Sequence, residues 1–180
     1  MRETRAEEKL LGAVKSFGFR FSGKVVLDIG SSTGGFTDVA LKGGAAKVVA
    51  VEKGTNQMRV ELRNNKRVEL HEKTDIFQFE SSEDFDVILA DVSFVSLKKI
   101  LRHVQSWGKE YLVLLKPQFE AKPEQLEKGI IKNNKIRREI IQEFEDWLKE
   151  NNFIIVDKQD SQVSGRFGNV ERVYWLRPVC

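Results

Sequence analysis

A glycine-bearing loop after an apolar run is the first feature of the sequence that could support chemistry. Residues 25 to 36 read VVLDIGSSTGGF. A buried parallel strand reads as a continuous apolar run, and glycines supply the backbone freedom of a strand-to-helix turn pressed against a ligand. The segment therefore predicts a strand that feeds a nucleotide-type cofactor pocket, with a helix that starts near Gly34. The alternative is an ordinary strand-turn-helix with glycines for close packing.

The spacing of this loop narrows the choice of cofactor. The order Asp28-x-Gly30-x-x-x-Gly34-Gly35 fits neither G-x-G-x-x-G nor G-x-x-x-x-G-K-[ST]. The loop also has no lysine, so a bound polyphosphate would lack its usual cationic clamp. It resembles instead motif I of S-adenosylmethionine-dependent methyltransferases.

Charged residues end several of the other apolar runs. Glu52 closes KVVAVE, where a carboxylate can accept hydrogen bonds from a ribose diol, and Asp75 in KTDIF could meet an adenine amino group. Asp91 closes FDVILAD, and Lys116 closes EYLVLLK directly before a proline, which favours extended backbone at the lysine. The alternatives are a capping or solvated glutamate and a lysine that snorkels out of the core.

These residues would be brought together by alternating strands and helices. Strands are predicted at 24 to 29, 47 to 52, 67 to 71, 85 to 91 and 110 to 116, and helices at 5 to 17, 35 to 42, 56 to 63, 96 to 106 and 135 to 150. Such alternation indicates parallel βαβ units, whose ligands bind beyond the carboxyl ends of the strands. The last two runs, FIIVDKQ and ERVYWLR, predict an antiparallel hairpin. We expect a single α/β domain over 1–180, with a Rossmann-like, seven-stranded sheet and helices on both faces.

Composition restricts the class of protein. The 180 residues carry 30 Lys and Arg against 27 Asp and Glu, a formal charge of +3 that permits nucleic-acid binding without requiring it. The one cysteine, Cys180, allows no intrachain disulfide, and a reducing cytoplasm is expected. His71 and His103 lie far apart, so no metal site is predicted. No apolar run approaches the length that spans a bilayer.

Five segments together resemble one family. They are GKVVLDIGSSTGGFTD at 23 to 38, DVILADVSFVSL at 86 to 97, LLKPQFEA at 114 to 121, KGII at 128 to 131 and GNVE at 168 to 171. They are similar to the TlyA (haemolysin A) family of FtsJ-like ribosomal RNA methyltransferases, from about Arg5 to Arg172. Family members normally begin with an S4-type RNA-binding domain. This sequence starts at TRAEEKL, so residues 1–22 are interpreted as an N-terminal helix and a remnant of the S4 linker.

The resemblance implies the cofactor, the substrate and the residues that bind them. It implies S-adenosylmethionine as cofactor and ribosomal RNA or a ribosomal subunit as partner. Carried over by position, it makes cofactor-pocket candidates of Asp28, Gly30, Ser31, Gly34, Gly35, Glu52 and Asp75. A Lys-Asp-Lys-Glu tetrad typical of ribose 2'-O-methyltransferases falls on Lys9, Asp91, Lys116 and Glu171.

The tetrad indicates methylation of oxygen. A ribose hydroxyl must lose its proton as it attacks, and a lysine can take that proton only in its neutral form, which burial and a nearby cation both favour. Lys116 is the expected base, with Asp91 between the two lysines and Glu171 positioning Lys9 or the substrate hydroxyl. Carbon methylation of pyrimidines usually needs a cysteine nucleophile, and the only candidate is terminal.

RNA would reach this site across a rim of basic residues. The candidates are Arg5, Lys9, Lys122, Lys128, Lys132, Lys135, Arg137, Arg138 and Arg166, with Phe167 as a ring that stacks a base or pins the hairpin. Two alternative functions stay open. One is a module that binds cofactor and RNA with weak or no catalysis alone, and the other is membrane lysis, which the absence of a spanning segment opposes.

Overall fold

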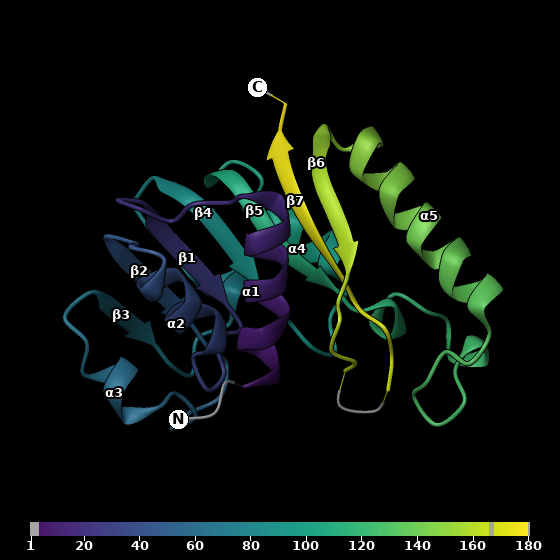
Figure 1. Cartoon of the computed structure of the whole chain (residues 1–180), viewed down its shortest axis with the longest axis horizontal. Coiled ribbons are helices and arrows are strands. Elements are labelled where there is room, and N and C mark those ends of the chain that lie inside the picture. The colour runs from purple at the N-terminus through teal and green to yellow at the C-terminus, as the bar shows by residue number, and fades with distance from the viewer. Residues whose placement is uncertain (1–3, 166–167, 180) are drawn as a thin grey trace.

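The computed structural model describes residues 4–165 and 168–179. Within them, seven strands form one sheet in the order β3-β2-β1-β4-β5-β7-β6 (Figure 1). β1 to β5 are parallel, and β7 runs antiparallel between β5 and β6. The predicted Rossmann-like sheet with its C-terminal antiparallel hairpin is confirmed. The strands are β1 (Val25–Ile29), β2 (Lys47–Val51), β3 (Val68–His71), β4 (Phe85–Ala90), β5 (Gly108–Leu115), β6 (Phe153–Asp160) and β7 (Arg172–Pro178).

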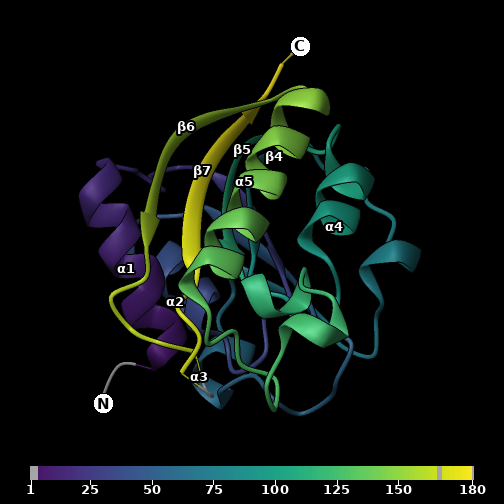
Figure 2. The same cartoon turned by 90° about the vertical axis from the view of Figure 1, so that its right-hand side faces the viewer.

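Helices cover both faces of this sheet. They are α1 (Arg5–Phe17), α2 (Gly35–Lys42), α3 (Val60–Arg63), α4 (Leu97–Val104) and α5 (Asn134–Glu150), with short 3-10 turns at Ile76–Gln78, Pro117–Phe119 and Pro123–Gln125. Figure 2 shows α1 and α2 on one side of the sheet and α4 and α5 on the other. Leu10 and Phe36 belong to the apolar core on the first side, and Ile100 and Phe144 to the core on the second. Because both faces are covered, the central strands read as continuous apolar runs.

The region before α3 differs from the prediction. A helix was expected over 56 to 63, but α3 begins only at Val60. Asn56 has a positive φ of 54°, and Arg59 is extended with a ψ of 142°, so the chain cannot be helical through this stretch. Residues 53 to 59 instead form turns that border the cavity described below.

Two further expectations from the sequence concern membrane-spanning helices and the basic rim. None of the helices in residues 4–165 and 168–179 is long and apolar enough to cross a membrane. Arg166 and Phe167, proposed as part of the RNA-facing rim, lie outside the described residues.

Candidate active site

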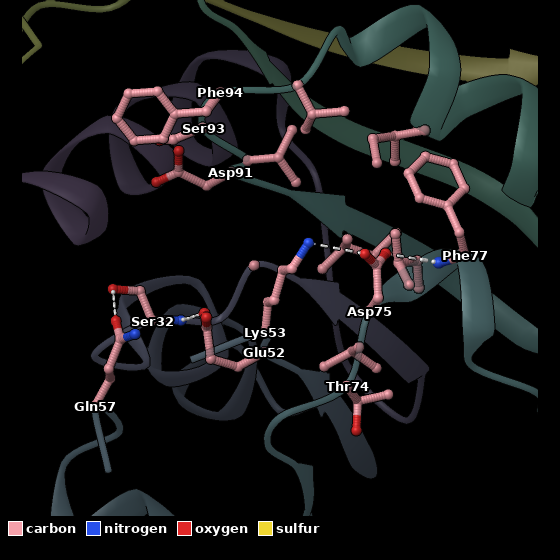
Figure 3. A pocket seen from close by; sticks show the side chains of 17 residues that line it. Ser32, Glu52, Lys53, Gln57, Thr74, Asp75, Phe77, Asp91, Ser93 and Phe94 are labelled. Carbon is pink, nitrogen blue, oxygen red and sulfur yellow. Dashed lines mark hydrogen bonds and ion pairs between the residues drawn. The ribbon is translucent and has the colours of Figure 1, made fainter. Parts of the chain in front are cut away.

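A cavity of about 670 Å³ opens at the carboxyl ends of the parallel strands. Its lining includes four of the predicted site residues, Gly30, Glu52, Asp75 and Asp91. Figure 3 shows Asp91 and Phe94 on one side of the cavity and Ser32, Glu52 and Gln57 on the other. The lining therefore carries three carboxylates, and its one lysine, Lys53, is bound to Asp75 at 3.0 Å. Such a lining favours a ligand with positive charge.

Asp28 lies fully buried beneath the start of the loop, at the end of β1. Thr37 of α2 donates a hydrogen bond to its Oδ2 over 2.6 Å, while Oδ1 is buried and accepts no hydrogen bond from the described residues. Burial raises the pKa of the Asp28 carboxyl to about 7, and the nearby charges of Asp91 and Glu52 act in the same direction. Ser31, also buried, has a hydroxyl with no partner among the described residues. Neither Asp28 nor Ser31 belongs to the lining of the cavity.

The loop glycines have different roles. Gly30 has a φ of 76°, and a Cβ there would lie 3.0 Å from the Asp91 carbonyl oxygen, so the β1 loop and the β4 end approach closely. Gly34 caps α2 with a φ of 90°, and a Cβ there would collide with Leu62. At Gly35 a Cβ would lie 2.9 Å from the Ala6 Cβ of α1. Gly34 and Gly35 thus bring α2 against its neighbours, and neither lines the cavity.

Glu52 and Asp75 both organise local backbone. Glu52 accepts hydrogen bonds from the backbone N–H of Ser32 at 2.8 Å and of Gly54 at 2.6 Å. A carboxylate has about four acceptor positions, so Glu52 can still accept from a ligand. Asp75 caps the turn Ile76–Gln78, and the Phe77 N–H and the Lys53 ammonium hold the pKa of the Asp75 carboxyl below its ordinary value. Capping, which the sequence suggested as an alternative only for Glu52, is thus the observed local role of Asp75, which also lines the cavity.

Asp91 and Lys116 form an ion pair across adjacent strands. They follow β4 and β5 directly, and the Lys116 Nζ lies 2.6 Å from the Asp91 Oδ1. The same ammonium donates a hydrogen bond to the Ser93 hydroxyl over 2.9 Å. Only 12% of the Lys116 side chain is exposed. Asp91 also lines the cavity, whereas Lys116 does not, so the pair lies at the edge of the cavity.

Lys9 and Glu171 form a second ion pair, which is more deeply buried. Their Nζ and Oε2 atoms lie 2.5 Å apart, and the side chains are 8% and 3% exposed. Lys9 is carried by α1, whose start is fixed by a capping box in which Thr4 and Glu7 bond each other. Glu171 directly precedes β7. Residues 162 positions apart are thus joined at the same end of the sheet.

No direct hydrogen bond or ion pair between the described residues joins Lys9–Glu171 to Asp91–Lys116. The expectation that Asp91 lies between the two lysines stays a prediction. The link between the pairs is Gln118, whose Nε2 donates to the Glu171 Oε1 over 3.3 Å. Sequence reasoning overlooked Gln118, although it belongs to the KPQFEA segment and follows Lys116 by two residues. It also overlooked Asn169, whose side chain bonds Ile131 N–H and Gly129 C=O and so holds the KGII loop.

Several residues of the predicted basic rim are held in ion pairs or buried. Arg137 is bound to Asp160 at 2.8 Å, and Lys132 lies 2.5 Å from Glu127. Lys9 is buried in its ion pair. Exposed members of the rim are Arg5, Lys122, Lys128, Lys132, Lys135 and Arg138, of which Lys132 and Lys135 are paired with glutamates.

The pKa of Asp28 leads to a stability prediction for the ligand-free protein. A folded-state pKa of about 7, above the ordinary value of 3.8, means that between these pH values the folded state holds a proton which the unfolded state has lost. Stability should therefore fall as pH rises from about 4 to 7 and stay low above pH 7. We expect the Asp28→Asn variant to gain about 3 kcal/mol relative to the wild type between pH 5 and pH 8. Urea unfolding at both pH values measures this change, and a gain independent of pH would contradict it.

Comparison with known proteins gives one family. The model of the FtsJ-like methyltransferase family matches residues 3–177. The 23S rRNA (cytidine-2'-O)-methyltransferase TlyA of Campylobacter jejuni is 37% identical over 175 residues, covering 96% of this chain and 69% of its own. Hemolysin A of Brachyspira hyodysenteriae is 38% identical, with coverages of 93% and 73%. The solved structure of a protein from Lactococcus lactis that is described as a hemolysin superposes on this one with a TM-score of 0.92. The two sequences are 36% identical, and the match covers 97% of this chain and 87% of the other.

Proposed function

Because the chain belongs to the FtsJ-like methyltransferases, and within them to the TlyA (haemolysin A) group, we propose that it methylates ribose 2'-hydroxyls of ribosomal RNA with S-adenosylmethionine. The C. jejuni relative supports cytidine as the nucleotide. The observation that carries the proposal is the Asp91–Lys116 pair at the mouth of the cavity. It supplies a proton acceptor beside a cofactor pocket and offers no sulfur nucleophile.

The cavity residues fit S-adenosylmethionine, which supplies a methyl group on a sulfonium as the electrophile. The carboxylates of Glu52, Asp75 and Asp91, which line the cavity, suit a cation. Asp28 and Ser31 are buried and do not belong to this lining. Glu52 keeps acceptor capacity for a ribose diol, and Asp75 for an adenine amino group. The close approach at Gly30 shapes the floor of the pocket.

Lys116 is the residue that acts directly on the second substrate, the RNA. In its neutral form Lys116 accepts the proton of the ribose hydroxyl as the oxygen bonds to the methyl carbon and the carbon–sulfur bond breaks. The Asp91 carboxylate, whose Oδ1 lies 2.6 Å from the Lys116 Nζ, stabilises the ammonium that this proton transfer forms. Ser93, bonded to the same nitrogen, orients it. Lys9 and Glu171 complete the polar wall on the RNA side.

An exposed aromatic ring at the cavity mouth supports base stacking. Phe94 is 89% exposed, has a positive φ of 63° and packs against Phe119 with ring centroids 5.0 Å apart. Stacking of a base on an aromatic ring is worth about 1–3 kcal/mol. We expect Phe94→Ala to raise the KM for RNA by about 5–100-fold, with cofactor affinity within about twofold of wild type. Phe77→Ala, an exposed ring of the same cavity on the opposite side, is the matched control. An unchanged KM in Phe94→Ala would contradict this role.

The proposed function has a direct test. Calorimetry measures binding of S-adenosylmethionine, tritium transfer measures methylation of ribosomal RNA and intact subunits, and mass spectrometry locates the mark. A methyl group on a cytidine ribose is the expected product. Cofactor binding without transfer to any of these RNAs would instead favour the cofactor- and RNA-binding module, and a mark on a base would overturn the role of Lys116.

A further inference from the structure

Gln118 follows Lys116 by two residues, and its side chain contacts Glu171 of the other ion pair. It belongs to the 3-10 turn Pro117–Phe119, which begins immediately after Lys116. Its Nε2 donates to the Glu171 Oε1, while Lys9 donates to the Glu171 Oε2. Gln118 and Lys9 thus each donate to a different oxygen of the Glu171 carboxylate.

The turn that holds Gln118 is fixed relative to Lys116. Pro117 restricts its own φ, and the Phe119 N–H donates to the Lys116 carbonyl over 2.9 Å. The Ala121 N–H donates to the Pro117 carbonyl over 3.0 Å. A side chain on such a turn has little freedom to move apart from Lys116. The Gln118–Glu171 hydrogen bond therefore ties Lys9 and Glu171 to the strand end that carries Lys116.

Backbone also approaches the Glu171 carboxylate, at the oxygen that accepts from Gln118. A Cβ on Gly165 would lie 2.5 Å from the Glu171 Oε1 and 3.4 Å from the Asn169 carbonyl. Gly165 is held there by its N–H, which donates to that carbonyl over 2.8 Å. Glu171 is thus confined by Gly165, Lys9 and Gln118, and Gln118 is the one of the three that belongs to the segment following Lys116.

The second polar atom of Gln118 has no partner within the described residues. Its Oε1 is buried and accepts no hydrogen bond there. A buried acceptor without a donor costs roughly 1–3 kcal/mol, so a donor is expected when the site is filled. The N–H or O–H groups of an RNA nucleotide are donors that would reach this polar wall.

We propose that Gln118 is a positioning residue that aligns the Lys9–Glu171 pair with Lys116 and receives a hydrogen bond from the target nucleotide. This inference rests on the proposed function. The amide donates to Glu171, which fixes its orientation, because a carboxylate can only accept. The carbonyl oxygen, which has no partner among the described residues, is then the acceptor for the nucleotide, and a single side chain couples placement of RNA to the alignment of the two pairs.

The discriminating variant is Gln118→Glu, which keeps the shape and replaces the donor by a second carboxylate. At high pH the two carboxylates repel, whereas on acidification the new carboxyl takes up a proton and can again donate to Glu171. We expect kcat relative to wild type to be lowered about 10–100-fold at pH 8.5 and to recover as pH falls. A residue that only fills space would not give this recovery.

Two further variants complete the experiment. Gln118→Leu loses both hydrogen bonds, so we expect a lowered kcat and a raised KM for RNA at every pH, without recovery. Gln125→Glu is the matched control, because Gln125 sits in the neighbouring turn Pro123–Gln125 and uses its Oε1 to accept from Lys122 N–H, which glutamate can still do. Its rates should follow wild type. Wild-type kcat in Gln118→Glu, or a loss that does not change with pH, would overturn the inference.

Unfolding of the free protein separates this inference from the proposed function. Two adjacent carboxylates should make Gln118→Glu progressively less stable than wild type as pH rises, in the absence of RNA or cofactor. A wild-type enzyme that transfers no methyl group would defeat the proposed function while this titration still reported the Gln118–Glu171 contact. An unfolding profile parallel to that of wild type would show that the contact is absent.

Discussion

Lys116→Ala is expected to lower kcat for RNA methylation by about 10²–10⁴-fold, the range that a positioned acid or base contributes. The variant removes the proposed proton acceptor and leaves Asp91 without its ion-pair partner. Lys116 itself does not line the cavity, so S-adenosylmethionine should still bind. Single-turnover tritium transfer, with cofactor affinity measured by calorimetry on the same preparation, tests both expectations.

The opposite end of the same two strands offers a matched control. Lys109 and Asp86 form an ion pair of 2.8 Å at the start of β5 and β4, as Lys116 and Asp91 do just beyond their ends. Lys109→Ala removes the same kind of side chain from the same pair of strands, far from the cavity. Its kcat should match wild type. Comparable losses in the two variants would mean that Lys116 acts through strand pairing and would remove it as the base.

Lys9→Met is expected to destabilise the protein by roughly 3–5 kcal/mol, because it leaves a buried Glu171 without its cation. The double variant Lys9→Met with Glu171→Leu removes both charges, so it should recover most of that stability. Its methyl transfer should nevertheless stay at least about 100-fold below wild type, since neither group can act on the RNA side. Urea unfolding and transfer assays on the two variants measure the two effects separately.

An exposed lysine provides the reference for this measurement. Lys135 lies 3.8 Å from Glu139 on the surface of α5, with 77% of its side chain exposed. Lys135→Met should change the free energy of unfolding by less than about 1 kcal/mol. Wild-type activity in the double variant Lys9→Met with Glu171→Leu would mean that the Lys9–Glu171 pair is only a structural contact. Lys116 would then act without Lys9.

The strand ends could be predicted from the sequence because their signals are local. A continuous apolar run followed by an acidic or basic residue marks Glu52, Asp91 and Lys116, and parallel strands bring their carboxyl ends to one edge. Asp91 and Lys116 are in fact paired across β4 and β5. The Lys9–Glu171 contact could be anticipated only through the family resemblance, since nothing local connects residues 162 positions apart.

Features that depend on tertiary packing could not be predicted from local sequence signals. The late start of α3 follows from turns at residues 53 to 59, and helical propensity in the sequence does not reveal them. The positive φ of Phe94 goes against the preference of a bulky residue and was not foreseen. The hydrogen bonds of Gln118 to Glu171 and of Asn169 to the KGII loop join segments that only the folded sheet brings together.

The position of β7 determines when the site can form. β7 is the last strand of the chain, yet it lies inside the sheet, between β5 and β6, and Glu171 directly precedes it. Long-range pairing of this kind forms slowly, because distant segments must first be brought together. The first strands of the sheet could therefore build the cavity, but Glu171 could not hold Lys9 and Gln118 in place until β7 had inserted between β5 and β6. Insertion of β7 and formation of the Lys9–Glu171 contact are thus one folding event.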